Sequence, residues 1–173
     1  MSSGDSSTER EAEIRRCIAD VMQLLDELGT GWTVAGAFAA AKYRDRYRYT
    51  TDGDFLVLWH PDLPAALEGV GFETRLSRDG EDVHLIRARR SDGSIDLIIA
   101  GTDYQRLAIE RGAHAVLTIE DVLVHKVIAW RPKDQDDIRS ILSAGHEFDR
   151  EYVERWTIEW GFVDRWHEAL GWT

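Results

Sequence analysis

Two aspartates, Asp52 and Asp54, flank Gly53 and lead directly into an apolar run at residues 55–58. Side chains two residues apart on a strand point to the same face of a sheet, and their Cα atoms lie roughly 6.5 Å apart. At that distance two ionised carboxylates repel by about 2–3 kcal/mol at an effective dielectric constant of about 20. A cation offsets this repulsion, and hard divalent cations prefer oxygen ligands. The pair therefore predicts a strand whose first residues bind a metal ion.

The alternative interpretation of the pair is a solvated turn, because Thr-Asp-Gly-Asp is also favourable turn chemistry. Two further features favour the metal site. Asp96 occurs early in an apolar segment, where a carboxylate is costly unless it is paired or bound to metal. Gly36 and Ala37 join an expected strand to an expected helix, where glycine lets the backbone approach a ligand and the free N–H groups face phosphate. Three acids on neighbouring strands beside such a turn fit two-metal phosphoryl or nucleotidyl transfer.

Composition limits the class of protein. The chain has 173 residues, 43% of them hydrophobic and 31% charged, which is typical of a globular domain with a helical appendage. Its net charge of −11 disfavours non-specific binding to nucleic acid or to an anionic membrane. A single cysteine, Cys17, excludes an internal disulfide, and neither a secretion signal nor an apolar run of 18 residues occurs. We therefore expect a cytoplasmic protein with no membrane contact.

Hydrophobic periodicity and turn signals predict an α+β protein: a small mixed β-sheet with flanking helices and a helical C-terminal part. The turns Asp79-Gly80 and Asp92-Gly93 predict hairpins. The expected helices are 8–28, 37–43, 63–69, 104–111, 119–130, 134–142 and one or two within 149–170, and the expected strands are 32–35, 54–59, 72–76, 83–88 and 95–100.

We expect three parts along the chain. Residues 1–7 form a disordered tail, residues 8–131 the core, and residues 132–173 a helical extension packed on that core. Four of the seven tryptophans occur in the last 18 residues, and Trp156, Trp160 and Val163 suggest one helical stripe. Core packing is the favoured interpretation of this stripe; self-association, a partner interface and adenine stacking are the alternatives.

The order of the acidic and glycine motifs resembles that of the DNA-polymerase-β-type nucleotidyltransferase superfamily. Ala35-Gly36-Ala37 is similar to the first motif of that superfamily, Asp52-Gly53-Asp54 to the second, and Asp96 to the third. The pattern at Arg48, Thr50, Asp52 and Asp54 resembles Arg-x-Thr-x-Asp-x-Asp of small bacterial AbiEii-like proteins from toxin–antitoxin systems. Residues 120–123, Lys126, Arg131 and the acids at 134, 136 and 137 continue this resemblance.

The resemblance implies the nucleotidyltransferase fold and Mg²⁺-dependent transfer of a nucleoside monophosphate from an NTP to a hydroxyl. It implies catalytic and metal-binding roles for Asp52, Asp54 and Asp96, which would hold two Mg²⁺ ions, with Mn²⁺ as a substitute. The nucleotide would contact Gly36, Ala37, Arg48, Thr50 and Lys126.

Several basic residues have two interpretations. Lys126 lies in an apolar helical pattern and either reaches the triphosphate or pairs with Asp134 or Asp137. The basic run from Lys42 to Arg48 either attracts a nucleotide or polynucleotide, or is a solvated helix end. Arg87 and Arg89 share one face of a strand and either line the cleft near Asp96 or belong to a solvated outer face.

Two departures from the superfamily pattern leave room for other functions. Ala37 replaces the usual glycine or serine, and Gly53 replaces a hydrophobic residue, which is expected to loosen the strand and lose a core contact. The alternatives are a catalytically inactive nucleotide-binding or protein-interaction module, such as one half of a toxin–antitoxin pair, and a metal-dependent phosphohydrolase. For a transferase, the acceptor is a protein, a tRNA 3′ end or a small molecule such as an aminoglycoside.

Overall fold

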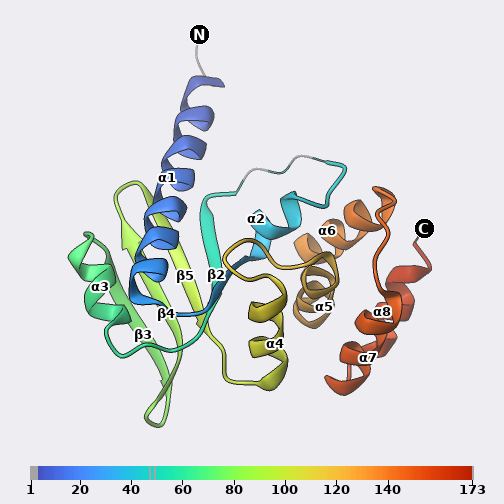
Figure 1. Ribbon diagram of the computed structural model, residues 1–173. Helices are drawn as coiled ribbons and strands as arrows, with labels where there is room; N and C mark the ends of the chain where they lie inside the picture. Colours follow the sequence, from blue (N-terminus) through green and yellow to red (C-terminus); the bar gives the residue numbers. More distant parts are fainter. Residues whose placement is uncertain (1–3, 47, 49, 173) are drawn as a thin grey trace. The chain divides into compact units, whose positions relative to one another are not determined.

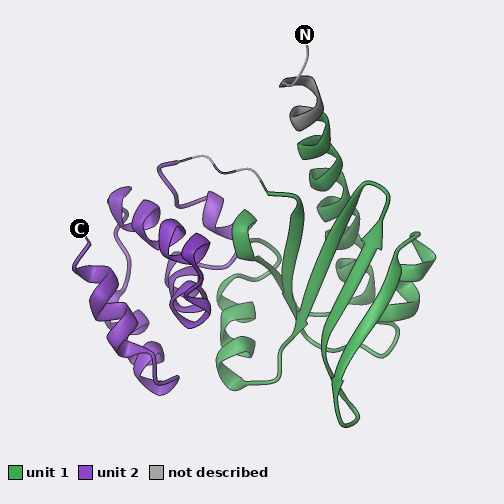
Figure 2. Ribbon diagram, turned by 180° about the vertical axis from the view of Figure 1, so that it is seen from behind, with its two compact units in different colours: residues 1–38, 49–116 green, residues 39–48, 117–173 purple. Residues whose placement is uncertain are grey.

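The structure is a computed structural model that describes residues 4–46, 48 and 50–172, with side chains from residue 9 onward. The chain divides into two compact units, coloured separately in Figure 2. Unit 1 comprises residues 1–38 and 49–116, and unit 2 comprises residues 39–48 and 117–173. The observed α+β architecture, with a mixed sheet and flanking helices, confirms the predicted fold class.

Unit 1 is built on a five-stranded mixed sheet with the strand order β1-β2-β5-β4-β3 (Figure 1). β2 and β5 are parallel, and the other three pairs of neighbouring strands are antiparallel. Gly80 adopts φ +58° in the turn between β3 and β4, as expected for a hairpin with Asp-Gly at its tip. The strands are β1 (Trp32–Ala35), β2 (Asp52–Val57), β3 (Glu73–Asp79), β4 (Asp82–Arg90) and β5 (Gly93–Ile99).

Two helices cover one face of this sheet, as Figure 1 shows. They are α1 (Gly4–Leu28) and α3 (Leu63–Gly69), and their apolar side chains form one core cluster with alternate residues of the strands. Cys17 lies in this core, where burial raises the pKa of its thiol to about 11. Every second residue of each strand therefore points away from α1, toward the opposite face.

Gly53 lies where side chains of α1 and β5 fill the space beside β2. A Cβ atom at position 53 would lie 2.7 Å from Cδ1 of Ile95 and 2.8 Å from Cγ1 of Ile18. The expectation that glycine here loses a core contact is therefore wrong, because the Ile18 side chain of α1 fills the space. The strand keeps its position against the helix by having no side chain at residue 53.

Unit 2 is helical. α5 (Ile119–Ala129), α6 (Pro132–Ser143), α7 (Arg150–Glu159) and α8 (Val163–Leu170) pack on one another, with α5 contacting both α6 and α7. The remaining helices are α4 (Asp103–Arg111) in unit 1 and α2 (Gly36–Ala41), whose residues fall in both units. None of the described helices is both long and apolar enough to cross a membrane.

Three sequence-based boundaries differ from the structure. Residues 4–7 are helical rather than a disordered tail, and residues 1–3 lie outside the described part. The expected boundary at residue 132 falls within unit 2, because α5 packs against α6 and α7. The expected stripe of Trp156, Trp160 and Val163 is wrong, since α7 ends at Glu159 and Gly161 turns the chain at φ +75°.

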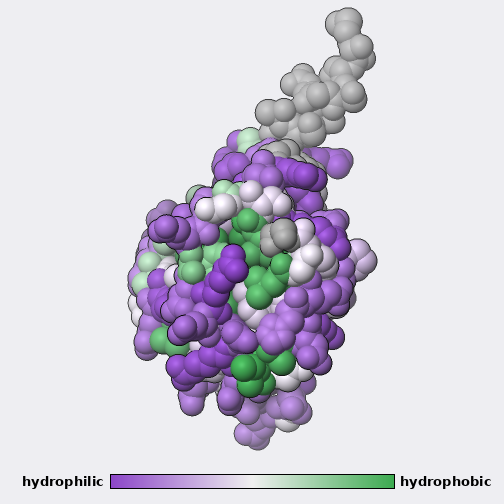
Figure 3. Space-filling view, turned by 90° about the vertical axis from the view of Figure 1, so that its right-hand side faces the viewer, coloured by the Kyte–Doolittle hydropathy of each residue, from purple (hydrophilic) through white to green (hydrophobic). Residues whose placement is uncertain are grey.

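The C-terminal tryptophans of unit 2 have different surroundings. Trp166 is fully buried, which confirms core packing for this residue, whereas Trp172 is half-buried and stacks on Trp130 with ring centroids 5.5 Å apart. Trp160 is 37% exposed and Ile158 is 58% exposed. Figure 3 shows hydrophobic areas within a mainly hydrophilic surface on one side of the molecule. Self-association through this part of the chain stays a prediction.

The packing of α1 against Gly53 predicts a graded response to larger side chains. Gly53→Ala is expected to shift the flexible ends of Ile18 and Ile95 at small cost, whereas Gly53→Val should lower the free energy of unfolding by about 1–3 kcal/mol through overpacking. The second substitution Ile18→Ala should relieve the crowding and recover part of the loss in the Gly53→Val background. Urea denaturation of the wild type, Gly53→Val, Ile18→Ala and the double variant measures this coupling, and strictly additive losses would contradict it.

Candidate active site

The parallel register of β2 and β5 brings the predicted acids together. Asp54 pairs with Asp96, and Asp52 pairs with Ser94 one row further along. Paired residues of neighbouring strands point to the same face, about 4.8 Å apart. Asp52, Asp54 and Asp96 therefore lie on one face of the sheet, opposite the face that α1 covers. Their roles as metal ligands and catalytic groups stay a prediction.

Gly36 fits tightly against Asp54. It follows the last residue of β1, begins α2 and adopts φ +61°, a conformation that L-amino acids with a side chain rarely take. A Cβ atom at residue 36 would lie 2.6 Å from Cγ and 2.8 Å from Cβ of Asp54. The backbone turn and the position of the carboxylate thus both require glycine, and the approach of a ligand to this turn stays a prediction.

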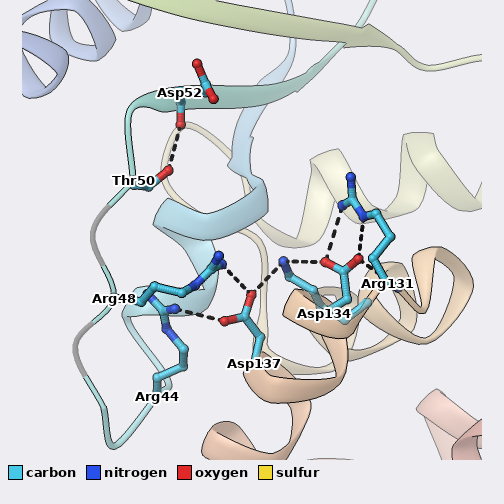
Figure 4. Close-up of polar contacts among 8 residues, drawn as sticks. Arg44, Arg48, Thr50, Asp52, Arg131, Asp134 and Asp137 are labelled. Atoms are coloured by element: carbon cyan, nitrogen blue, oxygen red, sulfur yellow. Dashed lines mark hydrogen bonds and ion pairs between the residues drawn. The ribbon is translucent and has the colours of Figure 1, made fainter.

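Hydroxyl groups surround Asp52 at the start of β2. Ser94 donates a short hydrogen bond to Oδ1 of Asp52, and Thr51 donates to Oδ2 at 3.4 Å. Thr50 donates to the backbone carbonyl of Asp52 at 3.3 Å (Figure 4). Thr50, predicted to bind nucleotide, thus contacts the backbone that presents Asp52. Ser94 was not singled out from the sequence, because only the β2–β5 register reveals that it adjoins Asp52.

Asp96 is engaged by arginines from the adjacent strand β4. Nη1 of Arg89 lies 3.0 Å from Oδ1 of Asp96, and Nε of Arg87 lies 3.9 Å from Oδ2. Both arginine side chains are about half exposed, so these ion pairs are partly screened by water. Of the two interpretations of Arg87 and Arg89, the position beside Asp96 is observed, and both side chains also face solvent.

The donor chemistry of this face fits a hard divalent cation, since three carboxylates supply oxygen ligands. Asp52 and Asp54 would hold the ion, with Gly36 leaving room for the Asp54 carboxylate. Within the described residues, no three histidine, cysteine or acidic side chains are arranged as a metal-binding group. Asp96 would be a third ligand only if the ion replaced its contact with Arg89.

A second group of charges, which we call the Asp137 cluster, lies within unit 2 (Figure 4). The buried carboxylate of Asp137 pairs at 2.8 Å with each of three cations. Asp134 pairs with Lys126 at 3.0 Å and with Nε of Arg131 at 2.6 Å. The cluster comprises Arg44, Arg48, Lys126, Arg131, Asp134 and Asp137.

The cluster shows which contacts Lys126 and Arg48 make. Lys126 is 6% exposed and bridges Asp134 and Asp137, which is the structural alternative considered for it. Contact with a triphosphate would require this lysine to leave both partners. Arg48 shares Asp137 with Arg44, and the Nε atoms of both arginines are buried without a hydrogen-bond partner among the described residues. Sequence inspection identified the basic run and the acids separately but not their pairing.

Comparison with known proteins supports the fold assignment. No protein-family model matches the sequence, and no curated protein shows significant sequence similarity to it. The structure is similar to that of ANT(2")-Ia in complex with adenylyl-2"-tobramycin, with a TM-score of 0.59 at 17% identity over 87% of this chain and 97% of the other. It is also similar to an antigenic nucleotidyltransferase-like protein from Paracoccidioides brasiliensis, with a TM-score of 0.51 at 17% identity over 92% and 93% of the two chains.

A third similar structure is that of JHP933 from Helicobacter pylori, with a TM-score of 0.54 at 14% identity over 97% of this chain and 82% of the other. At these identities the comparisons establish the fold alone. The chain therefore has the nucleotidyltransferase fold, as the motif order in its sequence predicts.

The contact between Gly36 and Asp54 predicts that Gly36→Ala is more damaging than an ordinary glycine substitution. Gly29→Ala is the matched control, because Gly29 has φ +67° and open space where a Cβ atom would lie. The control should lose about 1 kcal/mol of unfolding free energy, the cost of a left-handed alanine. Gly36→Ala should lose at least about 1 kcal/mol more, because it also displaces Asp54. Equal losses in urea denaturation would show that Gly36 is only a turn residue.

The Asp137 cluster predicts a pH-dependent contribution from Asp134. Burial alone would raise the pKa of Asp134, but hydrogen bonds from Arg131 and Lys126 outweigh it and hold that pKa below its ordinary value. The resulting stability is complete above the unfolded-state pKa of about 3.9 and is lost as the pH falls through the lower folded-state pKa.

Asp134→Asn should therefore lower the free energy of unfolding by about 2–3 kcal/mol at pH 7, and the deficit should shrink below about pH 4. Asp136→Asn is the matched control, because this neighbouring side chain is exposed and should change stability by less than about 0.5 kcal/mol. Urea denaturation at several pH values measures both variants. A deficit that stays constant down to pH 3 would disprove the role assigned to the ionised carboxylate.

Proposed function

We propose that this protein is a Mg²⁺-dependent nucleotidyltransferase that moves a nucleoside monophosphate from an NTP to a hydroxyl acceptor. The observation that carries the proposal is the pair formed by Asp54 and Asp96, with Asp52 two residues earlier on β2 and Gly36 packed against Asp54. Three carboxylates on one face repel one another, and a bound divalent cation at a metal-dependent transfer site would offset this repulsion. The nucleotidyltransferase fold is consistent with this use.

In the proposed reaction, the acceptor oxygen attacks the α-phosphorus of the NTP, the bond to the β-phosphate oxygen breaks, and pyrophosphate leaves. Asp52 and Asp54 would hold Mg²⁺, which would supply neutralisation of the charge on the α-phosphate and alignment of the reacting oxygens. Asp96 accepts the proton of the acceptor hydroxyl at a carboxylate oxygen. Ser94 and Thr50 keep Asp52 in position through its side chain and its backbone. Gly36 leaves room for the Asp54 carboxylate beside the turn into α2.

The proposal of a particular group within the superfamily rests on the sequence motif at residues 48–54. Arg48, Thr50, Asp52 and Asp54 support an AbiEii-like protein, and with it a role in a toxin–antitoxin pair in the cytoplasm. Contact of the nucleotide with Ala37 belongs to the same proposal, whereas Lys126 pairs with Asp134 and Asp137 and is left out of it. The second candidate is an inactive nucleotide-binding module, which Ala37 and the pairing of Arg89 with Asp96 favour. Retention of all three acids supports the enzyme over the module.

A labelling experiment tests the proposed function. The protein is incubated with Mg²⁺ and α-labelled NTPs, with and without single-stranded oligonucleotides, cellular RNA, an aminoglycoside or lysate protein. The wild type should transfer label to one of these acceptors, and Asp52→Asn/Asp54→Asn should lose at least about 1,000-fold of the rate, since both ligands of the ion are removed.

The control for this experiment is Asp79→Asn/Asp82→Asn, which makes the same charge change at the exposed β3–β4 hairpin and should keep the wild-type rate. Mg²⁺-dependent NTP binding without transfer would favour the inactive module. Transfer that survives in the Asp52→Asn/Asp54→Asn variant would exclude the proposed site.

A further inference from the structure

Ser94 restricts how the carboxylate group of Asp52 can be used. The two residues pair across the parallel strands β2 and β5, and the Ser94 hydroxyl donates a short hydrogen bond to Oδ1 of Asp52. Thr51 donates a longer bond, at 3.4 Å, to Oδ2. In Figure 4 the carboxylate group of Asp52 points away from Thr50, which reaches only the backbone carbonyl. Of the two carboxylate oxygens, Oδ1 is therefore the one engaged by a close, charge-assisted hydrogen bond.

The position of Ser94 is fixed from the other face of the sheet. Gly93, the first residue of β5, lies against α1, and a Cβ atom at residue 93 would be 2.9 Å from Cδ1 of Ile14. In the turn before β5, Nε of Arg90 pairs with Oδ1 of Asp92 at 2.6 Å. The Ser94 hydroxyl thus projects from a strand that is packed on one face and anchored at its turn, so it is held in place before any ion binds.

The carboxylates of Asp54 and Asp96 are restricted in a comparable way. A Cβ atom added to Gly36 would overlap Oδ2 of Asp54, so this oxygen lies against the turn between β1 and α2. On Asp96, Nη1 of Arg89 lies 3.0 Å from Oδ1, and Nε of Arg87 lies 3.9 Å from Oδ2. The three acids therefore offer an ion only part of their carboxylate oxygens.

We infer that Ser94 determines which cation the acidic face binds, favouring Mg²⁺ and Mn²⁺ over Ca²⁺. The inference rests on the proposed function, because it concerns the ion that Asp52 and Asp54 would hold. Mg²⁺ is usually bound through one or two carboxylates, at about 2.0–2.1 Å, and keeps several waters. Ca²⁺ takes about 6–8 oxygen ligands at about 2.3–2.6 Å and often uses both oxygens of one carboxylate. An aspartate that accepts a hydrogen bond at Oδ1 suits the first ion better than the second.

Loss of the Ser94 hydroxyl has different consequences for the two kinds of ion. Without it, the Asp52 carboxylate is free to turn about its Cβ–Cγ bond and to offer both oxygens, which favours Ca²⁺. Loss of a group that orients a metal ligand typically costs about 10–100-fold in metal affinity. That cost falls on Mg²⁺ and Mn²⁺, whereas the second carboxylate oxygen offsets it for Ca²⁺. A purely structural role of Ser94 would instead weaken the binding of all three ions alike.

Metal binding in the absence of nucleotide tests the inference directly. Electron paramagnetic resonance measures the dissociation constant of Mn²⁺, and isothermal titration calorimetry measures that of Ca²⁺. Ser94→Ala should bind Mn²⁺ about tenfold more weakly and Ca²⁺ with unchanged or higher affinity, so its preference for Mn²⁺ over Ca²⁺ should fall at least about tenfold. Ser94→Thr retains the hydroxyl group and should retain the wild-type preference.

Two controls locate the effect. Ser91→Ala makes the same chemical change at an exposed residue of the β4–β5 turn and should bind both ions like the wild type. Asp52→Asn/Asp54→Asn should lose the binding of both ions, since both ligands are removed. Equal changes of the two dissociation constants in Ser94→Ala, or no change in either, would overturn the inference. A preference that is lost in Ser94→Thr as well would also overturn it.

The transfer reaction separates failure of this inference from failure of the proposed function. Ca²⁺ added to the Mg²⁺-dependent reaction should inhibit Ser94→Ala at about tenfold lower concentration than the wild type. Transfer by the wild type, together with an unchanged ion preference in Ser94→Ala, would overturn the inference and leave the function standing. A shifted preference without transfer to any acceptor would support the role of Ser94 and contradict the function. Absence of binding of either ion to the wild type, or binding that survives in Asp52→Asn/Asp54→Asn, would contradict both.

Discussion

The candidate site depends on the parallel pairing of β2 with β5. This pairing sets Asp54 beside Asp96 and Asp52 beside Ser94, so residues 42 positions apart in the chain share one small area of a sheet. A shift of the register by one residue would turn one set of these side chains toward α1, where a carboxylate would be buried among apolar groups. The hydrophobic alternation of both strands therefore determines which side chains enter the core and places the acidic side chains together on the opposite face.

Two glycines allow close packing on the two faces of β2. Gly53 lets Ile18 of α1 approach β2, which fixes the strand on its apolar face. Gly36 turns the chain out of β1 beside Asp54 on the polar face. Gly36 agrees with the superfamily pattern and Gly53 departs from it. The structure shows a packing reason for each glycine. The departure at Gly53 is accommodated by the helix, so it is no longer an argument for an inactive protein.

The sequence predicts the elements better than it predicts their partners. The strands around Asp54 and Asp96 and the α+β class follow from local periodicity and turn residues. The pairing of Arg89 with Asp96 and of Arg44 with Asp137 links residues on different elements, and no local pattern encodes which strand or helix adjoins which. The expected boundary at residue 132 lies later in the chain than the observed one at residue 117 for the same reason: α5 carries apolar residues that fit either a sheet or a helical unit, and packing against α7 decides between them.

Cation coordination by Asp52 and Asp54 is the central claim of this account. The most direct measurement is anomalous scattering from crystals of the protein grown with Mn²⁺ and a non-hydrolysable NTP. The account predicts a metal peak bonded to carboxylate oxygens of Asp52 and Asp54, with Asp96 released from Arg89. Nucleotide bound elsewhere, or a metal peak that touches neither aspartate while Arg89 stays on Asp96, would contradict it.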